Sequence, residues 1–333
     1  MEGKIVLTGI KPTGDLHIGN YVGAIRPAIE LTQEPGVKPV YFIADYHALT
    51  TMRDPKELHD RTYEIAAAWI AFGLDPDKVL FYRQSDIPEI FELTWILSCL
   101  ASKGLLNRAH AYKAKVEENL EAGRDPDTGV NMGLFNYPVL MAADILLFKT
   151  DLVPVGKDQI QHVEIARDIA ENFNRTYGET FRLPEALIDE ATAVIPGLDG
   201  RKMSKSYGNV IPLFSDEKTL KKLIFRIKTD SKPPEEPKDP EESTLFHIYR
   251  GFAEKEEVEA LARRYREGIG YGEVKNMLFE LLNRKLAEPR RIYRELIDDK
   301  AKLDKWLAEG AEKAREIARP FMNDIRKKIG RLL

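Results

Sequence analysis

Two short segments far apart in the chain carry residue types suited to binding a triphosphate. One is the pentapeptide Lys202-Met203-Ser204-Lys205-Ser206, whose two ammonium groups could clamp phosphate oxygens. The other is His17-Ile18-Gly19-Asn20, which follows the turn Lys11-Pro12-Thr13-Gly14. A helix that starts at such a segment presents free backbone N–H groups to an anion. The pair indicates a nucleotide site, although a short basic loop by itself is more often a solvated surface segment.

Short apolar runs alternate with longer segments of helical periodicity through the first two hundred residues. Runs that are apolar throughout and separated by helices predict a parallel, doubly wound sheet covered on both faces. The expected strands are Lys4–Thr8, Val40–Ala44, Val79–Tyr82, Leu152–Val155 and Ala191–Ile195. Ligands collect beyond the carboxyl ends of such strands. The turn at 11–14 and the segment 156–159 should therefore lie near the site.

The helical segments set the expected domain organisation. Helical spacing is clear over 57–72 and 159–173, and Pro27 should bend or end the helix that starts at His17. Residues 1–212 are predicted to form the first domain, with a helical insertion at about 85–135. The pattern is helical from Phe214 onward, so a second, all-α domain is expected over 213–295. C-terminal helices over 296–333 are expected to pack back on the first domain.

Composition limits the class of protein. The chain has 333 residues, of which 43% are hydrophobic and 31% are charged, and this length suits about two domains. No apolar run approaches the roughly 20 residues of a membrane span, and the charged opening is not a signal peptide, so we expect a cytoplasmic protein without membrane contact. A single cysteine, Cys99, excludes an intrachain disulfide and a cysteine zinc cluster. Its apolar neighbours predict a buried thiol.

Charge is unevenly distributed along the chain. Residues 213–333 carry 28 Lys and Arg against 24 Asp and Glu, whereas residues 1–212 carry 22 against 30. A basic C-terminal part allows an RNA-facing surface. Many helical domains carry a similar surplus for solubility alone, so this signal is weak.

With these residues in view, the chain resembles the class I aminoacyl-tRNA synthetases, and within them the bacterial tryptophan type, over essentially its whole length. Besides the two segments above, the resemblance rests on the blocks 137–146 (YPVLMAADIL), 153–159 (VPVGKDQ), 161–170 (QHVEIARDIA) and 310–314 (GAEKA). The resemblance implies a Rossmann-like catalytic domain and an anticodon-binding role for the helical domain. It also implies a homodimer.

The implied reaction joins the carboxylate of L-tryptophan to the α-phosphate of ATP and then transfers the acyl group to tRNA(Trp). Magnesium would accompany ATP, and no protein-bound metal, zinc or iron–sulfur cluster is expected. The residues implied to be catalytic are His17, Asn20, Lys202 and Lys205. Those implied to bind ATP are Lys11, Pro12, Thr13, Gly19, Asn20, Gly156, Lys157, Asp158, Val194, Lys202, Met203, Ser204, Lys205 and Ser206. Those implied to bind tryptophan are Asp144, Tyr137, His47, Met141, Val153, Val155 and Gln159.

Each assignment has a plainer alternative in the residues themselves. A lone histidine at a helix start is more often a capping or surface residue, and Asp158-Gln159 before a helical pattern is by default an N-cap region. Asp144 differs, because a carboxylate within an apolar helix is costly unless it is paired. Even if Asp144 has no role in ligand binding, its carboxylate therefore requires a hydrogen-bonding or charged partner.

Departures from the common bacterial pattern concern the pocket and the loop. Lys11 stands where glutamine is common, Lys157 where glutamate is usual and Leu7 where an aromatic residue often lines the pocket. The stretch 196–200 is one residue short. We interpret these as signs of an auxiliary or second-type form.

Two other functions fit part of the pattern. A nucleotidyltransferase of this fold that activates a small acid would not need the basic helical part after Phe214. A non-catalytic paralogue that binds tRNA or tryptophan as a regulator would not need intact phosphate-binding segments.

Overall fold

The computed structural model of the chain describes residues 3–12, 14–156, 159–188 and 194–331. A five-stranded parallel sheet lies at its centre, with the strand order β3-β2-β1-β4-β5. The chain starts in the middle, builds outward to one edge and then returns to build the other. The strands are β1 (Ile5–Ile10), β2 (Lys38–Ile43), β3 (Leu80–Arg83), β4 (Leu152–Val155) and β5 (Glu185–Ile188). This order confirms the doubly wound α/β prediction.

The fifth strand is not where the sequence pattern placed it. Of the expected strand 191–195, residues 191–193 lie outside the described part, while Val194 and Ile195 are described and belong to no strand. The edge strand is β5, whose residues are only partly buried. An edge strand with one exposed side lacks the continuous apolar run used to find strands, so β5 was not predicted.

The strands separate two hydrophobic cores. Successive side chains of a strand point to opposite faces. Tyr41 and Ile43 of β2 accordingly pack in one core with α2, α4 and the C-terminal helices. Val40 and Phe42 pack in the other core with α5, α8 and α9. The near-continuous apolar sequence of β2 follows from burial on both sides.

Helices cover the sheet and continue beyond it. In the first half they are α1 (Ile18–Asn20), the π-helical turn η1 (Tyr21–Ile25), α2 (Arg26–Thr32), α3 (Asp45–Ala48), α4 (Pro55–Ala71), the 3-10 turn η2 (Gln84–Asp86), α5 (Pro88–Ser98), α6 (Lys103–Leu106), α7 (His110–Glu121), α8 (Met132–Leu147) and α9 (Ile160–Tyr177). In the second half they are η4 (Lys205–Tyr207), α10 (Glu217–Phe225), η5 (Pro240–Glu242), α11 (Thr244–Arg250), α12 (Lys255–Glu267), α13 (Tyr271–Asp298) and α14 (Lys300–Lys328).

Two local expectations are compared with the structure. Of the two effects expected for Pro27, a helix end is not found, because helical structure continues from α1 through η1 into α2. Pro27 lies in the first turn of α2, where a missing N–H costs least. Cys99 is exposed at the C-terminal end of α5 rather than buried. The apolar residues before it, such as Leu97, take the buried positions of that helix.

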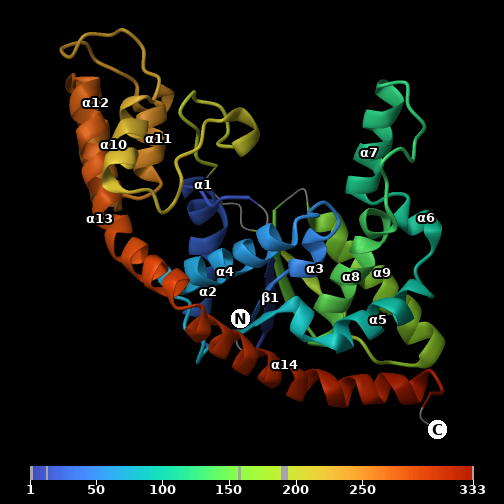
Figure 1. Cartoon of the computed structure of the whole chain (residues 1–333). Helices are drawn as coiled ribbons and strands as arrows, with labels where there is room; N and C mark the ends of the chain where they lie inside the picture. The colour runs from blue at the N-terminus through green and yellow to red at the C-terminus, as the bar shows by residue number, and fades with distance from the viewer. Residues whose placement is uncertain (1–2, 13, 157–158, 189–193, 332–333) are drawn as a thin grey trace.

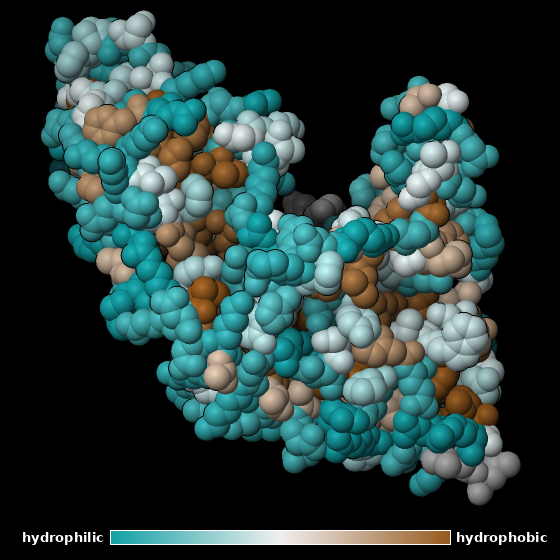
Figure 2. Space-filling view, in the orientation of Figure 1, coloured by the Kyte–Doolittle hydropathy of each residue, from teal (hydrophilic) through white to brown (hydrophobic). Residues whose placement is uncertain are grey.

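The molecule has two arms above the sheet. Figure 1 shows α10–α12 and the upper part of α13 rising on one side, and α7 rising on the other. The space-filling view shows the surface hollowed between these arms (Figure 2). Helices α13 and α14 run along the outside of the molecule and join the two sides (Figure 1). The exact domain boundaries stay a prediction.

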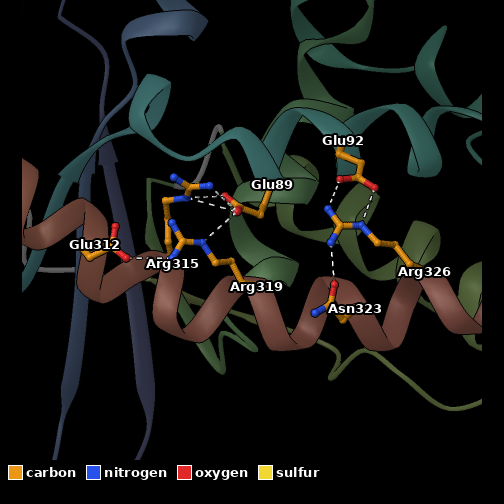
Figure 3. A network of polar contacts seen from close by, with 7 residues as sticks. All are labelled: Glu89, Glu92, Glu312, Arg315, Arg319, Asn323 and Arg326. Atoms are coloured by element: carbon orange, nitrogen blue, oxygen red, sulfur yellow. Dashed lines mark hydrogen bonds and ion pairs between the residues drawn. The ribbon is translucent and has the colours of Figure 1, made fainter. Parts of the chain in front are cut away.

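Helix α14 docks on the first half of the chain through charge pairs and one close backbone contact. Arg315 donates to the buried carboxylate of Glu89 at 2.9 Å, and Arg326 forms a two-pronged pair with Glu92 (Figure 3). At Gly310 the helix lies so close to β3 that an added Cβ would sit 1.8 Å from the carbonyl oxygen of Phe81. Only glycine allows this approach without a shift of the helix.

We therefore expect Gly310→Ala to destabilise the protein, although alanine favours helix by about 1 kcal/mol over glycine. Overpacking of this kind costs about 1–3 kcal/mol. The measurement is the free energy of unfolding by denaturant. Gly272→Ala in α13 is the matched control, because its added Cβ meets nothing within 4 Å. Equal effects of the two substitutions would contradict the close-contact argument.

Candidate functional site

A cavity of about 500 Å³ opens at the carboxyl ends of the central strands. Its walls come from β1, β2 and β4, from α3 and α8, and from the residues that follow β4. The structure brings all seven predicted tryptophan-binding residues to this one cavity, together with Lys11 and Gly156 from the predicted ATP set. The seven are His47, Tyr137, Met141, Asp144, Val153, Val155 and Gln159. Their shared position agrees with the expectation that ligands bind at this edge of a parallel sheet.

Asp144 is the buried charge of the cavity. Its side chain is 0% exposed, and it lies on α8 among apolar core residues. Its two oxygens accept from Gln84 Nε2 at 2.9 Å each, and Oδ2 lies 2.8 Å from Nε2 of His47. Burial raises the pKa of Asp144, and the hydrogen bonds from these neighbours oppose that rise. The partner that a buried carboxylate requires is thus present.

Gln84 was missed by the sequence analysis, although it is the residue that fixes Asp144. Its side chain is fully buried, and its Oε1 accepts from the backbone N–H groups of Tyr46 and His47 at 3.2 and 3.3 Å. It follows β3 directly, at the carboxyl edge of the sheet. A polar residue immediately after a buried strand was the signal that could have identified it.

A second buried carboxylate stabilises the same corner. Asp45 begins α3, is 7% exposed and accepts from the backbone N–H and the hydroxyl of Ser85. It also accepts from the N–H of Tyr46. These bonds hold α3 against η2, so the elements that carry His47 and Gln84 share one fixed orientation.

Tyr137 contributes a hydroxyl on the same helix as Asp144. Its Oη lies 2.6 Å from Nε2 of His162 on α9. Burial raises the pKa of Tyr137 to about 12, so the phenol stays neutral near pH 7. A neutral hydroxyl held by a histidine can accept from a substrate ammonium group.

Lys11 places an ammonium group on the wall of the cavity. Its Nζ donates to Oγ1 of Thr50 at 3.0 Å, and partial desolvation lowers the pKa of Lys11. The residue as a whole is exposed, but this contact turns its charge toward the cavity rather than away from it.

The apolar part of the cavity is closed by aromatic and branched side chains. Phe42 and Leu7 line it from β2 and β1, and Leu7 is 3% exposed. The Phe42 ring is close to the backbone of β1, where an added Cβ at Gly9 would come within 2.5 Å of it. Gly9 therefore makes room for the ring. An apolar pocket with one buried acceptor suits a flat ring that carries one N–H donor.

The two predicted phosphate-binding segments lie close to each other. Neither contributes a residue to the wall of the cavity. Leu16 and Ile18 hydrogen-bond with Leu213 and Ile211, which follow the Lys202–Ser206 loop by only a few residues. Next to them, Asn20 Oδ1 accepts from the backbone N–H of His17 at 2.9 Å. Burial, with a smaller effect from Lys205, lowers the pKa of His17. The lowered pKa favours the neutral imidazole.

The Lys202–Ser206 loop is anchored by a buried methionine, and its two lysines are exposed. Met203 is 4% exposed and packs into the core, while Asn209 accepts from the N–H of Ser204 and donates to Asp199. Lys205 Nζ lies 2.8 Å from Asp15, beside the Gly14 turn. The loop therefore places an ammonium group next to the segment that begins at His17.

Several predicted ATP-binding residues are not brought into the cavity. Thr13, Lys157 and Asp158 lie outside the described residues. Among those described, Lys202 and Ser206 are exposed on the loop, and Val194 is 65% exposed. Pro12 is buried in the turn before His17. Their roles stay predictions.

In the described part of the chain, no three His, Cys, Asp or Glu side chains come together to hold a metal ion. None of the helices found there is long and apolar enough to cross a membrane.

Comparison with known proteins gives one consistent result. The family "tRNA synthetases class I (W and Y)" matches residues 2–287. The tryptophan–tRNA ligase of Pseudomonas putida is 57% identical over 98% of this chain and 73% of that protein, and the one of Neisseria meningitidis is 51% identical over 99% and 98%. A crystal structure of tryptophanyl-tRNA synthetase from Campylobacter jejuni, complexed with ADP and tryptophan, superposes with a TM-score of 0.88 at 49% identity, covering 98% of this chain and 99% of that one.

The match to the family covers far more than half of the chain, and both relatives align over nearly all of it. The chain belongs to the class I tRNA synthetases of the tryptophan and tyrosine group.

Proposed function

We infer that this chain is a tryptophan–tRNA ligase. It would activate L-tryptophan with ATP to form tryptophanyl-adenylate and pyrophosphate, and then transfer the tryptophanyl group to tRNA(Trp). The single observation that carries the choice of amino acid is Asp144, a fully buried carboxylate on the wall of a largely apolar cavity. The relatives aligned over nearly the whole chain carry this same activity in their names.

Selection of tryptophan follows from the cavity. The indole ring would lie between apolar side chains such as Val153 and Met141, and its N–H would donate to Asp144. The tyrosine-activating members of the family must instead satisfy a phenol hydroxyl, which both donates and accepts. A carboxylate held by donors at the depth of the pocket is an acceptor and fits the indole N–H.

Activation needs positioning and positive charge rather than a nucleophilic side chain. The tryptophan carboxylate attacks the α-phosphorus, the bond to the bridging oxygen breaks, and the electrons leave with pyrophosphate. Charge on the phosphoryl oxygens and on the leaving group rises in the transition state. His17 and Asn20 would donate to phosphate oxygens, and Lys202 and Lys205 would bind the leaving pyrophosphate.

The remaining ATP contacts are proposed from the family resemblance. Gly156 and Asp158 would hold the ribose, although Asp158 lies outside the described residues. Magnesium would be bound by the phosphates of ATP and would offset their charge. We assign none of the chain's own side chains to the ion.

Partners and organisation are proposed on the same basis. The helical part 213–295 would bind the anticodon of the tRNA, on the arm formed by α10–α12 in Figure 1. A homodimer follows from the resemblance, and exposed apolar side chains such as Trp95 and Met132 are available to a second copy. Sedimentation at micromolar concentration would test it. We also propose a cytoplasmic location, because charged tRNA is used at the ribosome.

One assay separates this function from its two rivals. Tryptophan-dependent exchange of labelled pyrophosphate into ATP requires amino-acid activation, and charging of tRNA(Trp) requires the second step. A nucleotidyltransferase for another acid would exchange only with that acid, and a regulator without activity would not exchange at all. We expect exchange with tryptophan and transfer to tRNA(Trp).

The loop lysines should act mainly in the transition state. Lys202→Ala and Lys205→Ala each remove a contact that strengthens as charge moves onto pyrophosphate, so kcat should fall more than the KM for tryptophan rises. A loss of about 10²-fold matches removal of one preorganised donor. Pyrophosphate exchange measures both quantities. Lys255→Ala, on an exposed lysine at the start of α12, is the matched control, and parental rates in both loop variants would exclude the clamp.

Lys11 should make substrate binding sensitive to salt. Its ammonium group on the cavity wall can pair with the tryptophan carboxylate or the α-phosphate, and such a contact is screened by ions. The Kd for tryptophan should therefore rise more steeply with salt in the parent than in Lys11→Gln. Equilibrium titration at several salt concentrations measures both slopes. Parallel slopes would assign Lys11 no direct charge contact.

Asp144 should determine how strongly the enzyme prefers tryptophan over other aromatic amino acids. A site built around a buried hydrogen-bonding group rejects analogues without the matching group by about 10⁴–10⁵-fold, so the parent should discriminate strongly against phenylalanine. Asp144→Ala should depress tryptophan activation far more than it changes the KM for ATP. The melting temperature is measured beside the kinetics, with Asp77→Ala on an exposed loop as control. Near-normal tryptophan activation by Asp144→Ala would refute the assignment.

A further inference from the structure

We propose that Gln84 is a positioning residue for indole selection: it acts through Asp144, whose carboxylate it holds in the orientation that receives the indole N–H. This inference rests on the proposed function, because it names a further residue for the same site. Gln84 is not among the residues that line the cavity. Its effect on the substrate must therefore pass through its neighbours.

The contacts of Gln84 leave its side chain one orientation. Nε2 donates to both oxygens of Asp144 at 2.9 Å, and Oε1 accepts from the N–H groups of Tyr46 and His47. Turning the amide over would point Oε1 at a carboxylate and Nε2 at two backbone donors. Every partner would then be mismatched. In a buried site such mismatches are costly, so the hydrogen-bond network itself selects the orientation.

The same contacts form a closed ring around the carboxylate. His47 lies 2.8 Å from Oδ2 of Asp144, and its own backbone N–H donates to Gln84. The ring therefore joins α8, α3 and η2 through one amide. Tyr46 and His47 lie in the first turn of α3, where backbone N–H groups lack partners within the helix. Gln84 satisfies these donors and the carboxylate at once.

The base of this ring is itself fixed. Ser85, the next residue in η2, is bound to Asp45 through both its N–H and its hydroxyl. Asp45 starts α3, so η2 and α3 cannot separate without breaking these buried bonds. Gln84 thus extends from a rigid corner. A side chain held in this way can fix the plane of the Asp144 carboxylate.

The chemical consequence concerns the substrate's N–H. Burial makes the ionised form of Asp144 costly, and each donor that faces it favours that form. With Gln84 in place the carboxylate is oriented and keeps lone pairs for one further donor from the cavity. Without the amide, the carboxylate is free to turn or to take up a proton. Either change weakens the contact with indole, whereas a ring that lacks N–H has no such contact to lose.

The test compares tryptophan with β-(3-benzothienyl)alanine, in which sulfur replaces the indole N–H. Both are assayed by pyrophosphate exchange in the parent, in Gln84→Met and in Gln84→Glu. Methionine has a similar length and no amide. Glutamate keeps an acceptor for α3 but puts a second carboxyl group beside Asp144. Such a pair shares one proton, so Asp144 becomes a weaker acceptor for the indole N–H. We expect kcat/KM for tryptophan to fall about 10- to 100-fold in each variant, mainly through KM. The value for the analogue should fall by less than about threefold, and it rises where the unpaired carboxylate is relieved.

Three controls make the outcome decisive. Gln33→Met, at the exposed end of α2, should leave both substrates unchanged. The KM for ATP and the melting temperature report general damage, and Gln84→Glu stands in if Gln84→Met loses its fold. Equal losses for tryptophan and the analogue would overturn the proposal, because they would mean that Gln84 only shapes the pocket. Parental values for both substrates would overturn it as well. Failure of the proposed function is a separate result, namely a parent protein that does not activate tryptophan.

Discussion

A carboxylate with no exposure to water is the constraint around which this site is built. Asp144 lies on α8 with apolar neighbours on the core side and an apolar cavity on the other. Its burial is tolerable only because donors from two other elements reach it, Gln84 from η2 and His47 from α3. Those elements are placed by the carboxyl ends of β3 and β2. The parallel sheet and the buried charge therefore depend on each other.

The phosphate-binding side depends on contacts between segments that are remote in sequence. Residues 16–18 pair with 211–213, so the chain returns to its beginning just after the Lys202–Ser206 loop. This return brings Lys205 beside Asp15 and places Met203 next to Gly19. The loop is held by its apolar centre and by Asn209, while its charged ends stay at the surface. Such an arrangement allows the ammonium groups to change partners without unfolding the loop.

The sequence predicted the frame well because the signals of buried parallel strands and amphipathic helices are local. Four strands, the helices around 57–72 and 159–173 and the doubly wound order are found as expected. The partly exposed edge strand β5 was missed, because it lacks a continuous apolar run. Pro27 does not end the helix, because helical structure continues from η1 into α2.

The site was predictable only where residues could be matched to a family pattern. Spacing gave the phosphate-binding segments, and the resemblance gave the seven residues that the structure gathers in one cavity. The supporting residues Gln84, Asp45 and Asn209 were not found. Each forms hydrogen bonds with a polar group of a neighbouring residue, which in some cases lies far away in the sequence. Only the folded structure shows which polar groups are buried and lie close enough to pair. Cys99 shows the same limit, because apolar neighbours in sequence did not make it buried.

The two halves of the site differ in how their charges are satisfied, and this difference suits the tasks proposed for them. In the half proposed to bind tryptophan, Asp144 belongs to a fixed hydrogen-bond network. An acceptor whose position does not adapt to the wrong ligand favours discrimination. In the phosphate half, Lys205 pairs with the exposed Asp15. Exposed pairs are weak and exchange easily. A cation held in this way can move to a phosphate group as negative charge develops there, which is when its contact accelerates the reaction. Rigid selection and movable charge can thus share one sheet edge because different elements carry them.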